Sequence, residues 1–86
     1  MSAAREKHKG DLLRFLRTIQ KAGLPVESLG ERDRLVASGL IDSLALLQIV
    51  TYLEATHGID FAVRGVDPDQ LGSIGNILDL IGQESR

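Results

Sequence analysis

The chain has 86 residues and a formal charge of −2, and it contains neither cysteine nor tryptophan. This length fits a single domain over residues 1–86 with a thin core, which leaves little room for a deep catalytic pocket. The lack of cysteine excludes disulfides and cysteine-based zinc sites and is compatible with a reducing compartment. No apolar stretch approaches the roughly 20 residues that span a bilayer, and the N-terminus lacks the apolar middle of a secretion signal. We therefore expect a soluble cytoplasmic protein.

The charge is unevenly spread along the chain. Residues 1–21 hold six basic side chains against two acids, whereas residues 35–86 hold seven acids against two basic side chains. A basic first helix could be the footprint of a nucleic-acid-binding module. The alternative is a solvated helix face, which the isoelectric point of about 5.6 favours.

Apolar residues at three- and four-residue steps predict an amphipathic helix over residues 4–22. Its apolar face consists of Leu12, Leu13, Phe15, Leu16 and Ile19. Gly23 and Pro25 predict its end, because glycine tolerates the left-handed cap and proline cannot continue the hydrogen-bond ladder. Residues 24–41 then form a long connection, and we expect it to pack across the helices because it carries many apolar residues. These are Leu24, Val26, Leu29, Leu35, Val36, Leu40 and Ile41.

The clearest helix is predicted over residues 43–57, where Asp42 and Ser43 supply capping chemistry and Gly58 ends the helix. Its predicted apolar stripe consists of Leu44, Leu47, Val50 and Leu53, widened by Leu46 and Ile49. The following residues 59–63 are expected to be extended or irregular.

Two further elements complete the chain. Residues 67–71 predict a one-turn helix with Pro68 at its first position. Ser73 is expected to cap a last helix whose apolar face consists of Ile74, Ile77, Leu78 and Ile81. Three main helices, one short helix and no alternating strand predict a compact all-α bundle with a long loop after the first helix.

Residues 35–44, with the sequence Leu-Val-Ala-Ser-Gly-Leu-Ile-Asp-Ser-Leu, resemble the phosphopantetheine attachment site of acyl carrier proteins. In that family a Gly-hydrophobic-hydrophobic-Asp-Ser-Leu run opens a long apolar helix. The resemblance covers most of the chain, including the Gly58-Ile59-Asp60 exit and the short third helix before Ser73. It implies an acyl-carrier-like four-helix bundle that is not itself an enzyme.

The resemblance also implies a prosthetic group and partners. Ser43 would carry a covalent 4′-phosphopantetheine arm from coenzyme A, whose thiol holds an acyl or aminoacyl group as a thioester. Asp42 would help to position the phosphopantetheinyl transferase and its metal-bound coenzyme A, and Leu44 would form part of the recognition surface. The other implied partners are a loading ligase and downstream biosynthetic enzymes, and the protein would act as a monomer without nucleic acid or membrane.

The physical chemistry of a helix start agrees with this implication. Unpaired backbone N–H groups and the positive end of the helix dipole favour an anion there, so a phosphate on Ser43 should be tolerated. The alternative for Ser43 is a plain N-cap that contributes about 1 kcal/mol and has no chemistry. The same alternative, a cap or dipole partner, stays open for Asp42.

The predicted second helix departs from the acidic recognition helix of fatty-acid synthesis carriers. Glu54 is its only acid, and Ala45, Gln48 and Ala55 stand where such carriers usually have carboxylates. Steering toward basic partners would then be weak, so we expect docking to depend on apolar contacts. The candidate docking residues are Leu44, Ala45, Leu46, Gln48 and Glu54. This favours a specialised carrier, for a secondary metabolite or an activated amino acid, over the housekeeping one.

Two alternatives concern the apolar side chains of the helices. Leu46 either docks partners or packs against the long loop. Leu47, Val50, Ile74 and Leu78 either line a cleft for a fatty chain or form plain core, and plain core is favoured because any bundle needs such stripes.

Two rival functions can be weighed against the carrier. A hydrolase pair of Ser43 and His57 would be about 21 Å apart on one helix, too far to hydrogen-bond, and the flanks of Ser43 do not match a nucleophile elbow. His8 and His57 lack a metal-ligand cluster and are expected at the surface. The second rival is a helical protein- or nucleic-acid-interaction module without a prosthetic group, which would leave the Asp-Ser-Leu run as a coincidence.

Overall fold

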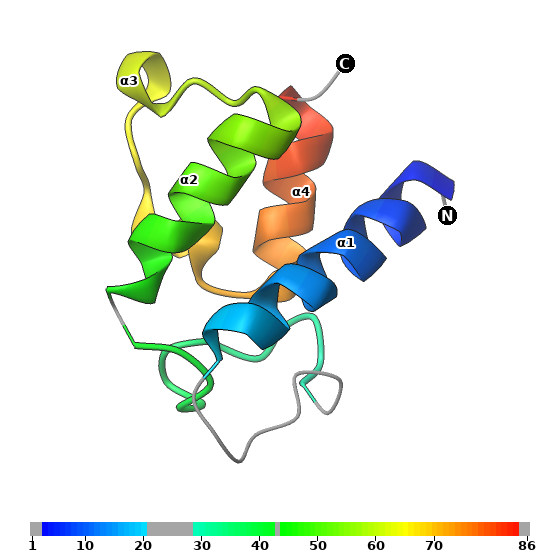
Figure 1. The fold of residues 1–86 in the computed structure, drawn as a ribbon, viewed down its shortest axis with the longest axis vertical. Helices are drawn as coiled ribbons and strands as arrows, with labels where there is room; N and C mark the ends of the chain where they lie inside the picture. Colours follow the sequence, from blue (N-terminus) through cyan, green and yellow to red (C-terminus); the bar gives the residue numbers. More distant parts are fainter. Residues whose placement is uncertain (1–2, 21–28, 43, 85–86) are drawn as a thin grey trace.

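The computed structural model describes residues 3–20, 29–42 and 44–84, which fold into an all-α bundle (Figure 1). The three longer helices are α1 (Ala3–Ile19), α2 (Ala45–His57) and α4 (Ile74–Glu84). Between α2 and α4 lie the one-turn helix α3 (Phe61–Arg64) and the 3₁₀ helix η2 (Pro68–Leu71). In the described residues, pairing of the β kind is limited to one antiparallel bridge between Arg34 and Ser73. The predicted fold class is confirmed.

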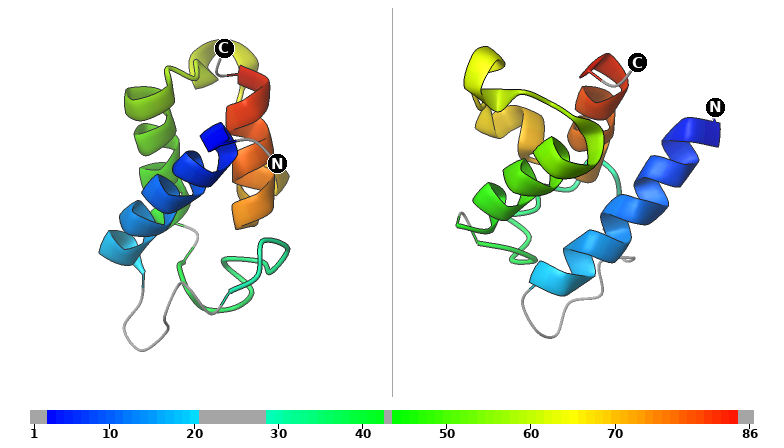
Figure 2. Two further views of the ribbon diagram at one scale, coloured as in Figure 1. Left: turned by 90° about the vertical axis from the view of Figure 1, so that its right-hand side faces the viewer. Right: turned by 45° about the horizontal axis from the view of Figure 1, so that its top comes forward.

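Helix α4 packs against both α1 and α2, and η2 packs against α2 and α4. Figures 1 and 2 show that α1 and α2 run in opposite directions, so the end of α1 and the start of α2 lie at the same end of the bundle. The described part of the long loop, residues 29–42, covers this end. The start of α2 therefore stands at the junction of loop and bundle.

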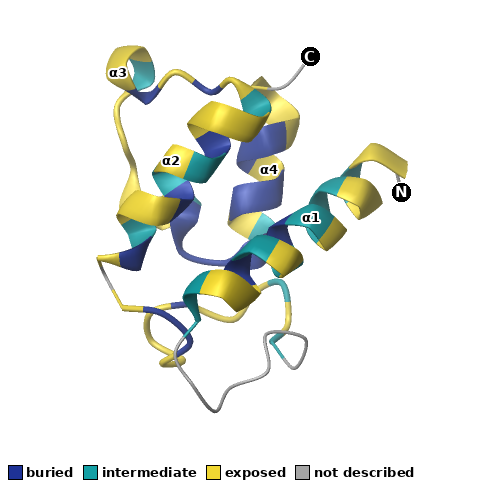
Figure 3. Ribbon diagram, viewed as in Figure 1, coloured by how far each residue is buried: buried dark blue, intermediate teal, exposed yellow. Residues whose placement is uncertain are grey.

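The core is built from one face of each long helix. Figure 3 shows burial along α4, whose buried residues are Ile74, Ile77, Leu78, Leu80 and Ile81. Leu12 and Leu16 of α1 pack into the same cluster. The predicted faces of these two helices are therefore confirmed, and Leu80 joins them.

The buried stripe of α2 differs from the predicted one. It consists of Ala45, Ile49 and Leu53, at steps of four residues, while Leu44 and Leu47 are 73% and 65% exposed. Leucines occupy several neighbouring positions at the start of α2, so the sequence allowed more than one stripe. The first core-facing position is occupied by the small Ala45, so hydrophobicity alone did not indicate which side of the helix faces the core.

The segment after α2 is more regular than predicted, because α3 begins at Phe61. The carboxylate of Asp60 accepts hydrogen bonds from the backbone N–H groups of Ala62 and Val63 at 3.0 and 3.2 Å, as an N-cap does. Ile59 and Phe61 are buried and anchor this turn. The helix predicted over residues 67–71 is confirmed as η2, with Pro68 first and the Asp67 side chain accepting from the Asp69 N–H.

The long loop packs across the helices over its described part. Leu35, Leu40 and Ile41 are buried, although Val36 is 42% exposed. The backbone N–H of Leu35 donates to the Gly72 carbonyl at 2.8 Å, and the N–H of Gly75 donates to the Glu31 carbonyl at 2.7 Å. The loop is thus hydrogen-bonded to the start of α4. Leu24, Val26 and the predicted helix stop at Gly23 and Pro25 lie outside the described residues.

Candidate functional site

The predicted attachment segment lies where the long loop meets α2. Leu40 and Ile41 are buried, and Asp42, the next residue, is exposed. A tight turn precedes them, in which Gly39 has a φ of 85° and donates to the Val36 carbonyl at 3.0 Å. Glycine suits this left-handed conformation because it has no Cβ. The buried pair therefore fixes the chain immediately before it reaches the surface.

Asp42 caps the start of α2. Its Oδ1 accepts a hydrogen bond from the backbone N–H of Ala45 at 3.0 Å, and its carbonyl accepts from the same N–H at 3.1 Å. Leu44 already has helical angles, with φ −70° and ψ −31°, so the helical turn begins before Ala45. The capping role that the sequence allowed for Asp42 is therefore present, and its carboxylate occupies one of the N–H donors of this helix end.

Ser43 itself lies outside the described residues. The residues on both sides of it are exposed: Asp42 faces solvent, and Leu44 is 73% exposed. The chain next to the candidate attachment position is therefore at the surface on both sides.

A hollow of about 370 Å³ lies beside the first turn of α2. Its walls come from the loop, from α2 and from the region of η2. The lining residues are Arg34, Val36, Ala37, Leu46, Pro68 and Gly72. Leu46 is half-buried, packs against the hydrophobic core and lines this hollow together with loop residues.

A family model described as a phosphopantetheine attachment site matches residues 13–81. The chain belongs to this family of carrier proteins. Such a carrier is not an enzyme: it bears a 4′-phosphopantetheine arm covalently on a serine, and the arm carries acyl or aminoacyl groups as thioesters. Phosphopantetheinyl transferases attach the arm, and partner enzymes act on the loaded group. The comparison with curated proteins and the comparison with solved structures each gave no match.

The start of α2 in this carrier protein fits such an arm. The flanks of the candidate serine are exposed, and the neighbouring hollow has an apolar wall formed by Val36, Ala37, Leu46 and Pro68. The thiol of a bound arm would supply the nucleophile that the cysteine-free chain lacks.

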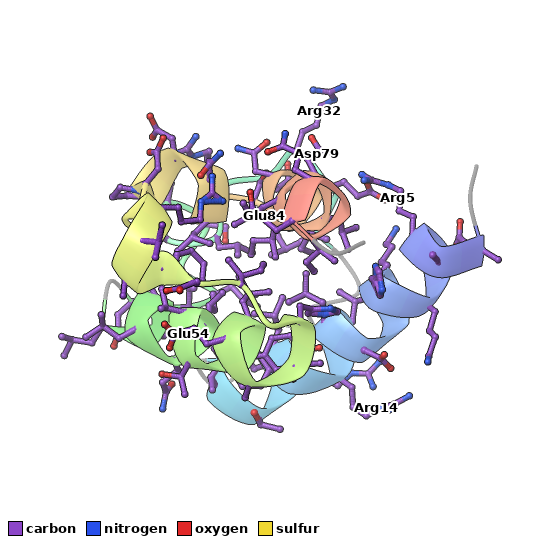
Figure 4. The ribbon with its side chains drawn as sticks, turned by 90° about the horizontal axis from the view of Figure 1, so that it is seen from above. Arg5, Arg14, Arg32, Glu54, Asp79 and Glu84 are labelled. Atoms are coloured by element: carbon purple, nitrogen blue, oxygen red, sulfur yellow. The ribbon has the colours of Figure 1, made fainter. Side chains whose placement is uncertain are left out.

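The candidate docking residues fall into two groups. Leu44, Gln48 and Glu54 are exposed, and Figure 4 shows Glu54 on the outer side of α2. Ala45 is only 7% exposed and belongs to the core, so its inclusion in a docking surface is corrected. Its side chain faces inward because it occupies the first core position of the helix.

Leu47 is an exposed apolar residue, although its helical spacing predicted a place in the apolar stripe of α2. It lies one turn after Leu44 and adjoins Gln48 and Thr51, which are also exposed. The polar Gln48 and Thr51 were the sequence signal for this outward face, because residues three and four apart share one side of a helix.

The four residues proposed as a fatty-chain cleft do not share a cleft. Ile74 and Leu78 are buried in the core, Val50 is half-buried, and Leu47 is exposed. The favoured alternative, plain core, therefore holds for Ile74 and Leu78.

The basic face of α1 is partly used inside the carrier protein. Arg5 donates to Glu31 of the loop at 2.9 Å and to Asp79 of α4 at 3.0 Å, and Lys9 lies 3.0 Å from Glu31. Figure 4 shows Arg5 and Asp79 on the same side of the bundle. These hydrogen bonds raise the pKa of Arg5, and those from Lys9 and Arg5 lower the pKa of Glu31. Two cations of the suspected nucleic-acid footprint thus serve to join α1, the loop and α4.

The two histidines were expected at the surface, but the structure places both between α1 and α2. His8 of α1 and His57 of α2 are half-buried, and their rings meet edge to face with centroids 4.8 Å apart. Over the residues that the structure describes, no group of three or more potential ligands could hold a metal ion. Within the same residues, every helix is too short or too polar to cross a membrane.

Proposed function

We propose that Ser43 is the serine that carries the arm. The matched range contains four serines: Ser28, Ser38, Ser43 and Ser73. Ser43 alone stands in an Asp-Ser-Leu run, and both of its neighbours are exposed at the start of α2. This exposed helix start is the observation that carries the proposal.

Two of the other serines have structural roles. Ser73 is 4% exposed, and its hydroxyl oxygen accepts the Asn76 N–H at 3.1 Å, so it caps α4 from inside the core. The hydroxyl of Ser38 donates to the Leu35 carbonyl at 3.0 Å and accepts the N–H of Leu40 at 3.3 Å. The Ser73 hydroxyl is buried and the Ser38 hydroxyl is engaged in local hydrogen bonds of the loop, so both suit a transferase poorly.

The chain's own residues would prepare the site for modification. Asp42 fixes the first turn of α2 through its bond to the Ala45 N–H and directs its remaining carboxylate oxygen toward the transferase and its metal-bound coenzyme A. Leu44 offers an apolar contact immediately after the serine. The buried Leu40 and Ile41 keep the preceding chain still, which lowers the conformational cost of docking.

The attachment proposal is tested by mass spectrometry after incubation with coenzyme A and a broad-specificity phosphopantetheinyl transferase. The wild-type chain should gain the mass of one phosphopantetheine group, and Ser43→Ala should gain nothing. Ser38→Ala is the matched control and should be modified like the wild type. No gain in the wild type, or a gain that survives Ser43→Ala, would overturn the proposal.

Partner enzymes, on this proposal, dock on the exposed face at the start of α2. Leu44 and Leu47 form its apolar centre, Gln48 and Glu54 lie further along, and Leu46 closes one edge beside the hollow. Exposed leucines of this kind bind an apolar pocket on a partner, since burial of each contributes about 1.5–3 kcal/mol.

The docking surface is tested with Leu47→Gln. Because Leu47 is exposed, the thermal midpoint should change little, whereas the rate of arm transfer or of loading should fall about tenfold. Val63→Gln is the matched control, since Val63 is 83% exposed on α3. An equal loss in both variants would contradict a surface centred on Leu47.

We further propose that the carrier is a specialised one, loaded by its own ligase, and that it works as a cytoplasmic monomer. Within α2 itself Glu54 is the only acid, so steering by the charge of this helix contributes little. We expect the loading rate at 0.5 M salt to stay within about threefold of its value at 0.05 M. A drop of tenfold or more would indicate acidic recognition of the housekeeping type.

A further inference from the structure

Four rings line the contact between α1 and α2. Phe15 of α1 stacks on Tyr52 of α2, with centroids 4.3 Å apart and an interplanar angle of 13°. Toward the start of α1, His8 meets His57, the last residue of α2, and His57 also lies 5.9 Å from Tyr52. Helix α1 packs more closely on α4 than on α2, and the ring contacts bridge α1 and α2.

His57 has no partner for one of its ring nitrogens. Its Nε2 is buried and accepts or donates no hydrogen bond within the described structure. A neutral imidazole can leave a lone pair in that place, but a protonated one must place an N–H there, because both nitrogens of an imidazolium are donors. A buried donor without an acceptor destabilises the closed contact.

The surroundings of His57 change its pKa in both directions. Burial lowers the pKa of His57, the neighbouring His8 lowers it further, and Asp11 of α1 raises it. From α4, Asp79 lines the hollow beside His8, but it is paired with Arg5. The closed contact therefore favours the neutral ring.

The C-terminal end of α2 would by itself favour a cation at His57. Two carbonyls of its last turns already accept hydrogen bonds from the chain that follows. The N–H of Gly58 donates to the Glu54 carbonyl at 3.2 Å, and the N–H of Ile59 donates to the Leu53 carbonyl at 3.4 Å. These bonds weaken the attraction of this helix end for an imidazolium, and burial remains the largest influence on the pKa of His57, which it lowers.

We propose that the His8–His57 contact is proton-sensitive: it holds α1 against α2 while the His57 imidazole is neutral, and protonation of His57 at mildly acidic pH releases it. The open form, in which His57 is solvated, binds a proton below about pH 6.5. The closed form binds that proton only at a lower pH. Closure is therefore fully favoured above pH 6.5 and is progressively lost as the pH falls below that value. This inference does not depend on the arm or its cargo.

The test is amide hydrogen exchange on the full chain, followed by NMR at pH 7.5 and pH 5.5 and corrected for intrinsic exchange rates. In the wild type, the protection factors of α1 near residues 8–15 should fall between pH 7.5 and pH 5.5. This fall should be at least about threefold larger than the fall in the protection factors of α4. The chain has only two histidines, so the double variant His8→Gln, His57→Gln removes all imidazole titration and should lose this difference. Lys7→Gln, at an exposed neighbouring position on α1, should respond like the wild type.

Two results would overturn the proposal. One is a pH response of α1 that persists in the double variant or is missing from the wild type. The other comes from direct NMR titration of the wild-type rings, in which His57 should titrate below pH 6.5; titration at or above that value would contradict a neutral-favouring contact. Each variant is compared with its own protection at pH 7.5, so a general loss of stability does not obscure the outcome.

Discussion

At the scale of single residues, Asp42 separates the core from the surface. The two residues before it are buried, and its own carboxylate accepts the Ala45 N–H while facing solvent. One side chain can therefore hold the helix start in place and remain accessible to a transferase. The capping role depends on the hydrogen-bond acceptor, whereas the role toward the transferase that we propose depends on the charge.

A pair of substitutions at Asp42 separates the roles. Asp42→Ala removes the cap and should lower the free energy of unfolding by about 1 kcal/mol. Asp42→Asn keeps an acceptor oxygen and should stay within about 0.5 kcal/mol of the wild type. Denaturant unfolding measures both values.

The rate of arm transfer, followed by mass, gives the second half of this test. If the charge of Asp42 positions the transferase, both variants are modified more slowly, whereas a purely structural role slows Asp42→Ala alone. An Asn variant as unstable as the Ala variant would show that the bond to Ala45 is not the stabilising contact.

At the scale of elements, the first turn of α4 supports the loop that leads to the site. A Cβ built on Gly75 would lie 2.8 Å from the Glu31 carbonyl oxygen, which is too close for a methyl group beside backbone. The loop can approach because glycine stands there, and the Gly75 N–H then bonds that carbonyl. A glycine inside a helix normally costs about 0.5–1 kcal/mol relative to alanine, so the contact must outweigh this loss.

Two glycine substitutions in α4 should therefore have opposite effects. Gly75→Ala should lower the thermal midpoint because the loop must move away. Gly82→Ala, where a Cβ meets nothing within 4 Å, should stabilise the protein by about 0.5–1 kcal/mol. Thermal unfolding of the two variants decides the matter, and a gain in stability for Gly75→Ala would show that the loop yields without cost.

At the scale of the whole molecule, Glu31 joins segments that are far apart in the sequence. It lies in the loop and pairs with Arg5 and Lys9 of α1, while Arg5 also reaches Asp79 of α4. These side chains are more than a third exposed, so solvent screening limits the contribution of the network to about 1 kcal/mol or less.

This network predicts a specific acid response. The pKa of Glu31 is lowered by hydrogen bonds from Lys9 and Arg5, so the folded state favours the carboxylate. Its contribution is therefore present above the unfolded value of 4.5 and is lost as the pH falls through the lower folded value. Glu31→Gln should be slightly less stable than the wild type at pH 7, and the difference should shrink toward pH 3. A constant difference across that range, measured by denaturant unfolding, would exclude the pairing as its cause.

The sequence by itself determined the order of the main helices and the all-α fold class, and it supplied the candidate position for a prosthetic arm. Helical spacing, Pro68 and the capping residues are local signals, because they act over one or two turns. The Asp-Ser-Leu run is equally local, so the candidate site could be found before any coordinates. Ser73 and Asp42 were identified as capping residues for the same reason.

Only the tertiary structure decided which side of α2 faces outward and which charged and imidazole groups meet. Leucines at 44, 46 and 47 are equivalent by hydropathy, and packing against α4 and η2 selects Ala45 for the core instead. Glu31 and Asp79 form ion pairs with Arg5, and the ring of His8 contacts that of His57, although many residues separate these partners in the sequence. Such pairs depend on how the helices are placed relative to one another, and no periodicity within a single segment encodes that placement.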